Sequence, residues 1–162
     1  MALDHDDIKE QIKAILEADS SLYDATGASG KVRQINVEYS DFLPRFSDPL
    51  PSIFIKNSIP FERVQKIGTK TRGSESNTAL LSNFRYDIVI ATEGKGARDT
   101  INKLDDFQKL VIEAIDADHK LKNGGALKVH DCTYESSKNF NDAVNNKKIQ
   151  GRIVTFVCKM VT

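Results

Sequence analysis

The sequence has no excess of charge of either sign, because 23 basic residues balance 23 acidic residues in a chain of 162. Proteins with general nucleic-acid affinity need a basic excess to neutralise phosphates, so that affinity is not expected. No apolar run approaches the roughly 20 residues of a membrane-spanning helix, and no polybasic patch marks a membrane surface. Residues 1–6 are acidic, unlike a signal peptide, so we expect the chain to stay where it is made.

Cysteine is scarce, since Cys132 and Cys158 are the two that the sequence contains. Two cysteines do not make the disulfide framework of a small secreted domain. Both fall in predicted strands, where we interpret them as ordinary buried thiols. A bridge between them would need adjacent strands and an oxidising compartment.

The three histidines form no recognisable metal site. His5 lies among acidic residues that suit a helix start, and His119 suits the dipole at a helix end. His130 and Cys132 could share one face of a strand, but two ligands do not close a metal site. We therefore predict no bound metal and no cofactor.

Familiar catalytic motifs are missing as well. Residues 94–96 read Gly-Lys-Gly before a helix, but the Walker spacing and the following Ser/Thr are absent, so we predict a simple turn. No Gly-x-Ser-x-Gly elbow occurs. Asp105 and Asp106 are expected on the solvated side of a helix, where nothing marks them as a catalytic pair. We predict no catalytic residue and no enzymatic activity.

The stretch that organises the chain is residues 84–129. Strict alternation over residues 84–90 predicts a strand with one face on a core. Apolar residues then recur at the helical period from Ala97 to Ile115, and glycines at 124 and 125 predict the helix stop. A further strand is expected over residues 126–134.

The rest of the chain supplies partners for this unit within one predicted domain, residues 1–162. Residues 6–18 predict an amphipathic helix. Residues 41–51 hold three of the four prolines and predict a surface crossing or the approach to a sheet edge. Residues 135–148 are polar and receive no assignment. Further strands are predicted over residues 31–39, 52–56, 59–67 and 149–161.

Residues 68–78 contain two glycines and no apolar side chain. Flanked by strands, they predict a long, projecting hairpin loop that packs on nothing in its own domain. Two interpretations stay open. The segment is either a solvated loop or an arm that orders against a partner, with Lys66, Lys70 and Arg72 as its charged contacts.

Two predicted elements carry more apolar surface than one copy is expected to cover. The helix after Gly96 is apolar over roughly 200°, about twice the stripe of a surface helix. Phe107 and Leu110 lie in that surplus, which must meet the first helix or another copy. The last strand, with Ile153 and Phe156, is apolar on both faces. We therefore predict oligomerisation through these residues.

The order of predicted elements resembles that of the tail-terminator (tail-completion) proteins of long-tailed bacteriophages and related viruses. The order is helix, strand, proline-led strand, long hairpin, strand, amphipathic helix, strand, strand. The resemblance covers nearly the whole chain and is one of order and pattern. It is carried by the opening helix with Ile8, Ile12 and Ile15, residues 48–55, the polar hairpin, residues 84–90, residues 101–115, residues 127–129 and residues 149–161.

The resemblance implies an α+β domain in which a mainly antiparallel sheet carries two helices on one face and a long hairpin arm. It implies a homo-oligomeric ring, usually a hexamer, that caps the tail tube and stops its polymerisation. The expected partners are sister copies, the tail tube protein and a head-completion or neck protein. Genomic DNA would pass through the lumen without sequence-specific binding, and the location would be the virion after assembly in the host cytoplasm.

Three alternatives remain open on the sequence. One is another neck protein, such as a head–tail connector or stopper. Another is a soluble α+β enzyme or ligand-binding domain whose site forms across an oligomer interface. The last is a cellular adaptor module.

Overall fold

The structure is a computed structural model that describes residues 5–27, 30–39, 46, 49–72, 75–94, 96–122, 129, 131–144 and 146–161, without the side chains of residues 59–81, 144 and 161. Two helices and a five-stranded, mostly antiparallel sheet make up that part of the chain, which confirms the predicted α+β class. In chain order the elements are α1 (His5–Glu17), β1 (Gln34–Val37), β2 (Ser52–Arg72), β3 (Glu75–Glu93), α2 (Ala97–Ala117), β4 (Asp131–Val144) and β5 (Lys147–Val161).

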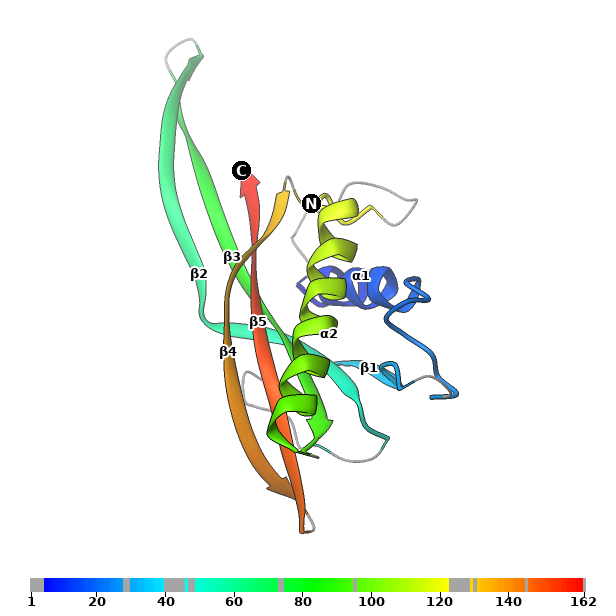
Figure 1. Cartoon of the computed structure of the whole chain (residues 1–162). Coiled ribbons are helices and arrows are strands. Elements are labelled where there is room, and N and C mark those ends of the chain that lie inside the picture. Colours follow the sequence, from blue (N-terminus) through cyan, green and yellow to red (C-terminus); the bar gives the residue numbers. More distant parts are fainter. Residues whose placement is uncertain are drawn as a thin grey trace.

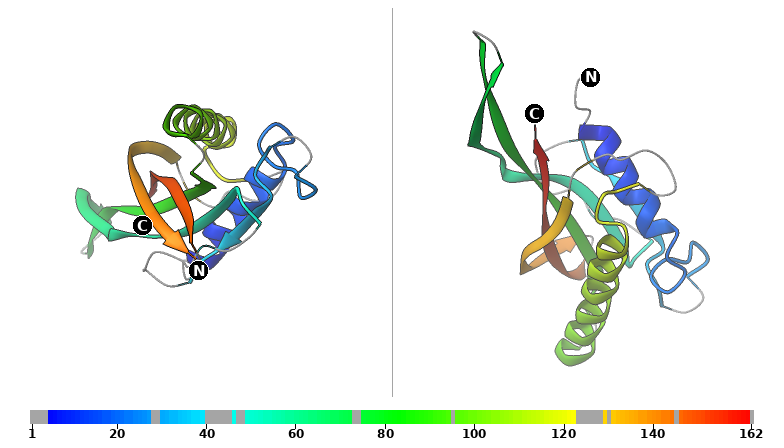
Figure 2. Two further views of the ribbon diagram at one scale, coloured as in Figure 1. Left: turned by 60° about the horizontal axis from the view of Figure 1, so that its bottom comes forward. Right: turned by 90° about the horizontal axis from the view of Figure 1, so that it is seen from above.

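The sheet has the strand order β1-β2-β3-β5-β4. β1 runs parallel to β2, and every other neighbouring pair is antiparallel. Figure 1 shows the β2–β3 hairpin extending well past the other strands. α1 contacts β1 and β2, whereas α2 contacts β3, β4 and β5, and the two helices also touch each other. Both helices therefore cover the same face of the sheet (Figure 2).

The main core lies between the helices and this face. Because strand side chains alternate, the even-numbered residues of β3, Phe84 to Ile90, point at the helices. α1 contributes Ile8, Ile12, Ile15 and Leu16, and α2 contributes Leu104, Phe107, Val111 and Ile115. Their spacing of three and four residues is the amphipathic pattern that the sequence predicted.

A second, smaller core covers the opposite face. Phe46 is 1 % exposed there and lies 5.3 Å, ring to ring, from Phe140 of β4 and 5.7 Å from Phe54 of β2. Val89, Ala91, Ile149 and Ile153 complete this cluster. The proline-rich segment predicted as a surface crossing thus carries an aromatic side chain that covers the sheet.

α2 ends earlier than its predicted glycine stop, which lies outside the described residues. Leu121 adopts a left-handed φ of 53°, and its amide donates to the Asp118 carbonyl oxygen at 2.8 Å. The Leu121 side chain is fully buried in the main core. Burial of this leucine compensates a backbone conformation that a non-glycine residue rarely adopts.

The two strands predicted over residues 52–56 and 59–67 are one strand, β2. Its pairing with β3 breaks after Asn57↔Tyr86 and resumes at Glu62↔Phe84, so residues 58–61 oppose Arg85 alone. Pro60 lies in this irregular stretch and has no N–H to donate to a ladder. Figure 1 shows β2 turning sharply before it rises into the hairpin. The irregularity redirects the strand.

The predicted long hairpin arm is confirmed, but the prediction that residues 68–78 form a loop at its tip is wrong. The ladder between β2 and β3 continues from Gly68↔Ala79 to Arg72↔Glu75, and only residues 73–74 fall between the strands. Hydrogen bonding across a hairpin stabilises strand structure even where no side chain is apolar. The projecting segment is therefore a paired ribbon.

β4 is the largest element that the sequence did not predict. It begins at Asp131, inside the strand predicted over residues 126–134, and continues to Val144 through the polar segment that had no assignment. A register shift between Tyr134 and Ser136 matches the bulge expected from its shifted apolar pattern. β1 is shorter than predicted, and residues 23 and 32 form only an isolated bridge beside it.

Candidate interaction surfaces

The first candidate surface is the end of the β2–β3 hairpin. β3 pairs with β5 only as far as Leu81↔Val161, whereas its pairing with β2 continues to Glu75. Residues 66–72 and 75–80 therefore form a two-stranded ribbon beyond the sheet, which we call the arm. Lys66, Lys70 and Arg72, the predicted contacts, lie at its register positions opposite Leu80, Asn77 and Glu75. The structure does not describe their side chains.

The second candidate surface is the pair of open sheet edges. Within the described residues, β1 covers β2 only as far as Val37↔Ile55, and the Glu38 amide adds one bond to the Ile55 carbonyl. Among the residues that the structure describes, β2 from Asn57 to Arg72 has strand pairing on its β3 side alone, interrupted at residues 58–61. At the other end of the sheet, β4 pairs with β5 on one side over its whole length. Open edges of this length are ready templates for another strand.

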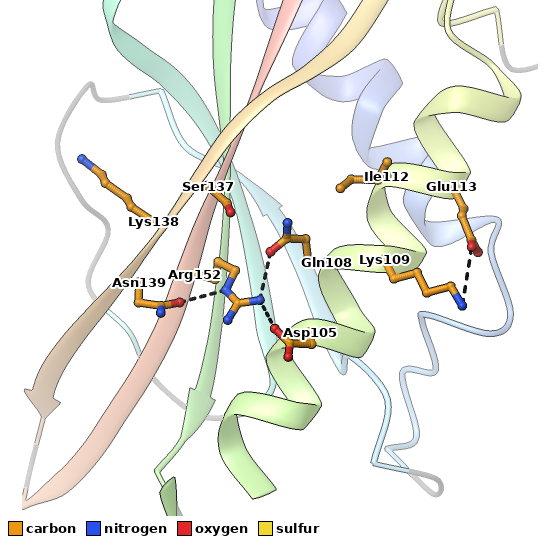
Figure 3. Close-up of a pocket in the computed structure, with 9 residues that line it drawn as sticks. All are labelled: Asp105, Gln108, Lys109, Ile112, Glu113, Ser137, Lys138, Asn139 and Arg152. Atoms are coloured by element: carbon orange, nitrogen blue, oxygen red, sulfur yellow. Dashed lines mark hydrogen bonds and ion pairs between the residues drawn. The ribbon is translucent and has the colours of Figure 1, made fainter. Parts of the chain in front are cut away.

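A groove of about 630 Å³ lies between α2 and strands β4 and β5. Figure 3 shows Arg152 of β5 at its base, reaching toward α2 and β4. The Arg152 Nε donates to Asn139 Oδ1 at 2.8 Å, and Nη1 donates to Gln108 Oε1 at 2.9 Å and to Asp105. The arginine side chain is 10 % exposed, so these bonds clamp α2 to the sheet.

The side chains that line the groove fit a structural contact between α2 and the sheet. Its remaining charged residues, Lys109 and Glu113, form an exposed ion pair of 4.0 Å on α2, while Lys138 points away from Arg152 in Figure 3. Asp105, which was predicted on the solvated side of α2, is half exposed, and its carboxylate accepts a hydrogen bond from Arg152 Nη1. A charged residue directly before the apolar Ile153 and Val154 of this strand was the sequence signal for the contact.

A buried polar network lies on the opposite face of the sheet. Lys56 and Asp87 are directly opposite residues of β2 and β3, and the lysine Nζ lies 3.1 Å from Asp87 Oδ2. Thr155 of β5 donates to Asp87 Oδ1 at 2.7 Å. Because both charged residues are 6 % exposed, the pair is a desolvated, hydrogen-bonded ion pair. Sequence patterning missed it, because the two charges are far apart along the chain.

The prediction that β5 presents spare apolar surface is wrong. Ile153 is 8 % exposed and Phe156 is fully buried within the single chain. Phe156 belongs to the main core, and Ile153 packs in the cluster around Phe46. Both faces of β5 are thus covered internally, which removes the two residues as subunit contacts.

α2 likewise covers most of its apolar surface within the chain. Phe107 is 5 % exposed in the main core, and Leu110 packs partly buried against it. The sequence led us to expect that the wide apolar stripe of α2 meets either the first helix or another copy. The stripe contacts α1 in the structure. Large exposed apolar side chains on the described surface are scattered, at Tyr39, Ile101 and Tyr134.

The described histidines, His5 and His119, and both cysteines contact other side chains of the fold. His5 Nδ1 lies 2.8 Å from the Tyr86 hydroxyl, and His119 Nδ1 lies 3.0 Å from Asp131 Oδ1. His130 lies outside the described residues, as does Lys95 of the predicted turn. Cys132 and Cys158 are buried, opposite each other on β4 and β5.

The described residues contain no group of three or more His, Cys, Asp or Glu side chains placed to hold a metal ion. Among the described helices, none has the length and apolar composition needed to cross a membrane. A scan of protein-family models and a search of curated proteins found no match to this chain.

Proposed function

We propose that the protein is a structural virion subunit that forms a ring, expected to be a hexamer, on the last ring of a tail tube. The ring ends tube polymerisation and offers the surface that joins the head. The observation that carries this proposal is the arm, which extends beyond the last β3–β5 pair as two strands without further sheet neighbours among the described residues.

The arm is suited to contacts outside its own subunit. A two-stranded hairpin is at best marginally stable alone in water, and residues 68–78 supply no apolar side chain to pack on the domain. A neighbouring copy or the tube protein can supply the missing contacts. The order of elements, from the opening helix to β5, agrees with the resemblance to tail terminators.

The expected partners are sister copies, the tail tube protein and a head-completion or neck protein. Genomic DNA passes through the ring, and the balanced total charge supplies no strong attraction for it. No chemical step is part of this function. A head–tail connector or stopper could use the same arm for its contacts. Such a protein differs from a terminator in where it binds in the neck, on the head side rather than on the tube end.

The test is assembly with purified tail tubes. Negative-stain imaging and sedimentation should show rings of this protein, free or capping tube ends, and capped tubes should stop growing. A protein that stays monomeric and leaves tube growth unchanged would contradict the proposal. Rings that bind isolated heads but never tubes would assign it to another part of the neck.

A shortened chain separates assembly from folding. Deletion of residues 69–77 removes strand pairs that join only β2 and β3, so the melting temperature should change by no more than about 3 °C. Ring formation or tube capping should be lost. Normal capping by the shortened chain would show that the arm is dispensable.

A further inference from the structure

We propose that the free protein forms a twofold dimer in which the outer edge of β4 pairs with the outer edge of β4 on a second copy. The paired segment is residues 136–144, with Phe140 opposite its own copy at the twofold axis. The five-stranded sheets of the two copies then continue as one sheet. This inference goes beyond the proposed function, because a twofold contact joins copies in pairs and needs neither the arm nor a tail tube.

The outer edge of β4 is open over its regular part. β4 has β5 on one side, and within the described residues no strand pairs with its other side. After the register shift between Tyr134 and Ser136, the nine residues 136–144 form an unbroken ladder with β5. This segment is longer than an average strand of five to six residues, and it contains no proline. Such an edge is a ready template for another strand.

Symmetry restricts how this edge can pair with its own copy. Two antiparallel strands of one sheet are related by a twofold axis perpendicular to the sheet, which exchanges the strands and keeps each face on its own side. Directly opposite residues then lie on the same face, so the axis must pass between the two copies of one residue. The choice of that residue fixes every other pair of the ladder.

The charges of the edge favour one choice. Lys138 and Asp142 are the charged residues of the segment, and both are exposed. They lie on the same face, about 13 Å apart along the strand, and within the described part of the chain neither forms an ion pair. Centred on Phe140, the ladder sets Lys138 of each copy opposite Asp142 of the other. The dimer thereby gains two facing pairs of opposite charge.

Other positions of the axis are less favourable. An axis at residue 138 or 142 sets two lysines or two aspartates against each other, which is destabilising. An axis at residue 139 or 141 sets one of the charges opposite Phe140. A lysine on an edge strand normally discourages pairing, but a second β4 in the Phe140-centred register presents a carboxylate to that lysine. The edge is therefore blocked to many strands and complementary to itself.

The residues beside the axis suit close approach. On the helix face Asn139 is opposite Asn141 of the second copy. Asn139 Oδ1 accepts from Arg152 Nε at 2.8 Å, so its amide nitrogen can donate to the Asn141 carbonyl oxygen across the axis. On the other face, a Cβ atom at Gly151 of β5 would run into the Phe140 ring. The ring therefore lies over β5, on the side away from the open edge.

The twofold contact leaves the arm unobstructed. The arm begins beyond the last β3–β5 pair, Leu81↔Val161, whereas residues 136–144 pair with β5 residues 147–155. Figure 1 shows the arm at one end of the sheet and the end of β4 at the other. The dimer contact and the contacts proposed for the arm thus use separate surfaces, and they can be tested separately.

Charge reversal tests both the dimer and its register. Lys138→Glu sets acidic residues opposite each other in both pairs, and Asp142→Lys does the same with lysines. Each variant alone should dimerise about 30-fold more weakly than the wild type. An equimolar mixture of the two variants should regain dimers, because every acidic residue then faces a lysine. Analytical ultracentrifugation measures the dissociation constants, and circular dichroism reports folding.

Lys120→Glu and Asp116→Lys are matched controls, because they make the same charge changes at exposed residues outside β4. Both should dimerise like the wild type. Wild-type protein that is monomeric at about 100 μM would overturn the inference, as would a mixture that stays as weak as its components. Tube capping reports on the proposed function independently. Dimers that never cap tubes would support the twofold contact and contradict the proposed function.

Cross-linking gives a second test that does not depend on charge. Lys138→Cys and Asp142→Cys are introduced together in a chain that also carries Cys132→Ser and Cys158→Ser. Directly opposite residues have Cβ atoms about 4.5–5.5 Å apart, near the span of a disulfide. Each disulfide between copies forms as one glutathione disulfide is reduced to two glutathiones, and covalent dimers should appear on a denaturing gel. Combining Lys138→Cys with Ala143→Cys, on opposite faces, should give none. Equal cross-linking of the two variants would overturn the register.

Discussion

Cys132 and Cys158 are directly opposite on β4 and β5, with their Sγ atoms 2.9 Å apart and both side chains buried. A disulfide has a sulfur–sulfur distance of about 2.05 Å, so the two atoms are within roughly 0.9 Å of that bond length. The strand adjacency that the sequence left open is thus present. The cysteines join the edge strand to its neighbour at the start of β4.

Glutathione disulfide should convert the two thiols into one intramolecular disulfide, while two molecules of glutathione are released. Opening of the first residues of the edge strand gives the reagent access. The disulfide would close the chain segment between Cys132 and Cys158 into a loop, which should raise the free energy of unfolding by about 3 kcal/mol. Mass spectrometry after alkylation in denaturant measures the bond, and Cys132→Ser must abolish it. Exclusive formation of cross-linked dimers would contradict the prediction.

Stability should fall in alkaline solution. The pKa of Tyr86 is raised by burial and by the neighbouring Cys158, and the pKa of Cys158 is raised by its hydrogen bond to Cys132 and by burial. The ordinary pKa is 9.0 for a cysteine thiol and 10.0 for a tyrosine hydroxyl. Above these values the unfolded chain loses protons that Cys158 and Tyr86 keep in the native protein. Each group then lowers the free energy of unfolding by about 1.4 kcal/mol per pH unit.

Urea unfolding across pH 7 to 11 measures this effect, because the decline should begin near the unfolded cysteine value and steepen above that of tyrosine. Tyr86→Phe should lose stability at neutral pH, since its hydroxyl bonds His5 at 2.8 Å. The same variant should show a shallower decline above pH 10. Parallel curves for the two proteins would show that Tyr86 does not contribute.

Removing the Arg152 clamp should destabilise the fold by about 2 to 3 kcal/mol, because its partners lose a charged, buried donor. Arg152→Ala is compared with Lys109→Ala on the rim of the same groove. Lys109 and Glu113 are 75 % and 59 % exposed, so that change should cost less than about 0.5 kcal/mol. Equal urea midpoints for the two variants would show that Arg152 is not a clamp.

Gly151 is required by close approach rather than by its backbone angles. A Cβ atom there would run into the Phe140 ring and lie 2.5 Å from the Ile90 carbonyl oxygen. Gly151→Ala should therefore cost about 2 kcal/mol or more. Gly94→Ala is the control, because its nearest contacts would be at an ordinary 3.4 Å. Thermal melting measures the stability of both variants. Adding Phe140→Leu to the Gly151→Ala variant should restore only part of the lost stability, since the Ile90 carbonyl oxygen remains in the way.

Local patterns predicted the elements whose faces differ clearly in polarity. α1, α2 and the inner half of β3 follow their apolar periods, and both helices cover one face as expected. The strand predicted over residues 126–134 reached only the start of β4, and residues 68–78 of the predicted hairpin were expected as a loop, because Asn, Ser and Gly have weak strand preference. Their strand structure comes from pairing with β5 and between β2 and β3, which sequence propensity does not contain.

The surplus of apolar surface was misjudged for a specific reason. Phe46 comes from a proline-rich segment in which no period is visible, yet it covers Phe54 and the far face of the sheet. Leu121, after the end of α2, similarly enters the main core. Residues outside regular elements thus supplied the cover that the sequence assigned to other copies. The candidate surfaces that remain are the backbone edges, which hydropathy cannot reveal, and the arm, which the polar segment at residues 68–78 had indicated.

The irregular segment at residues 58–61 sets the direction of the arm, because β2 turns there before it continues into the hairpin. Gaining or losing one residue in this segment would re-aim the hairpin and exchange the sides on which its side chains alternate. The packed cores would keep their sequence. A change of one residue in this segment would therefore redirect the arm toward a different neighbour without altering either core.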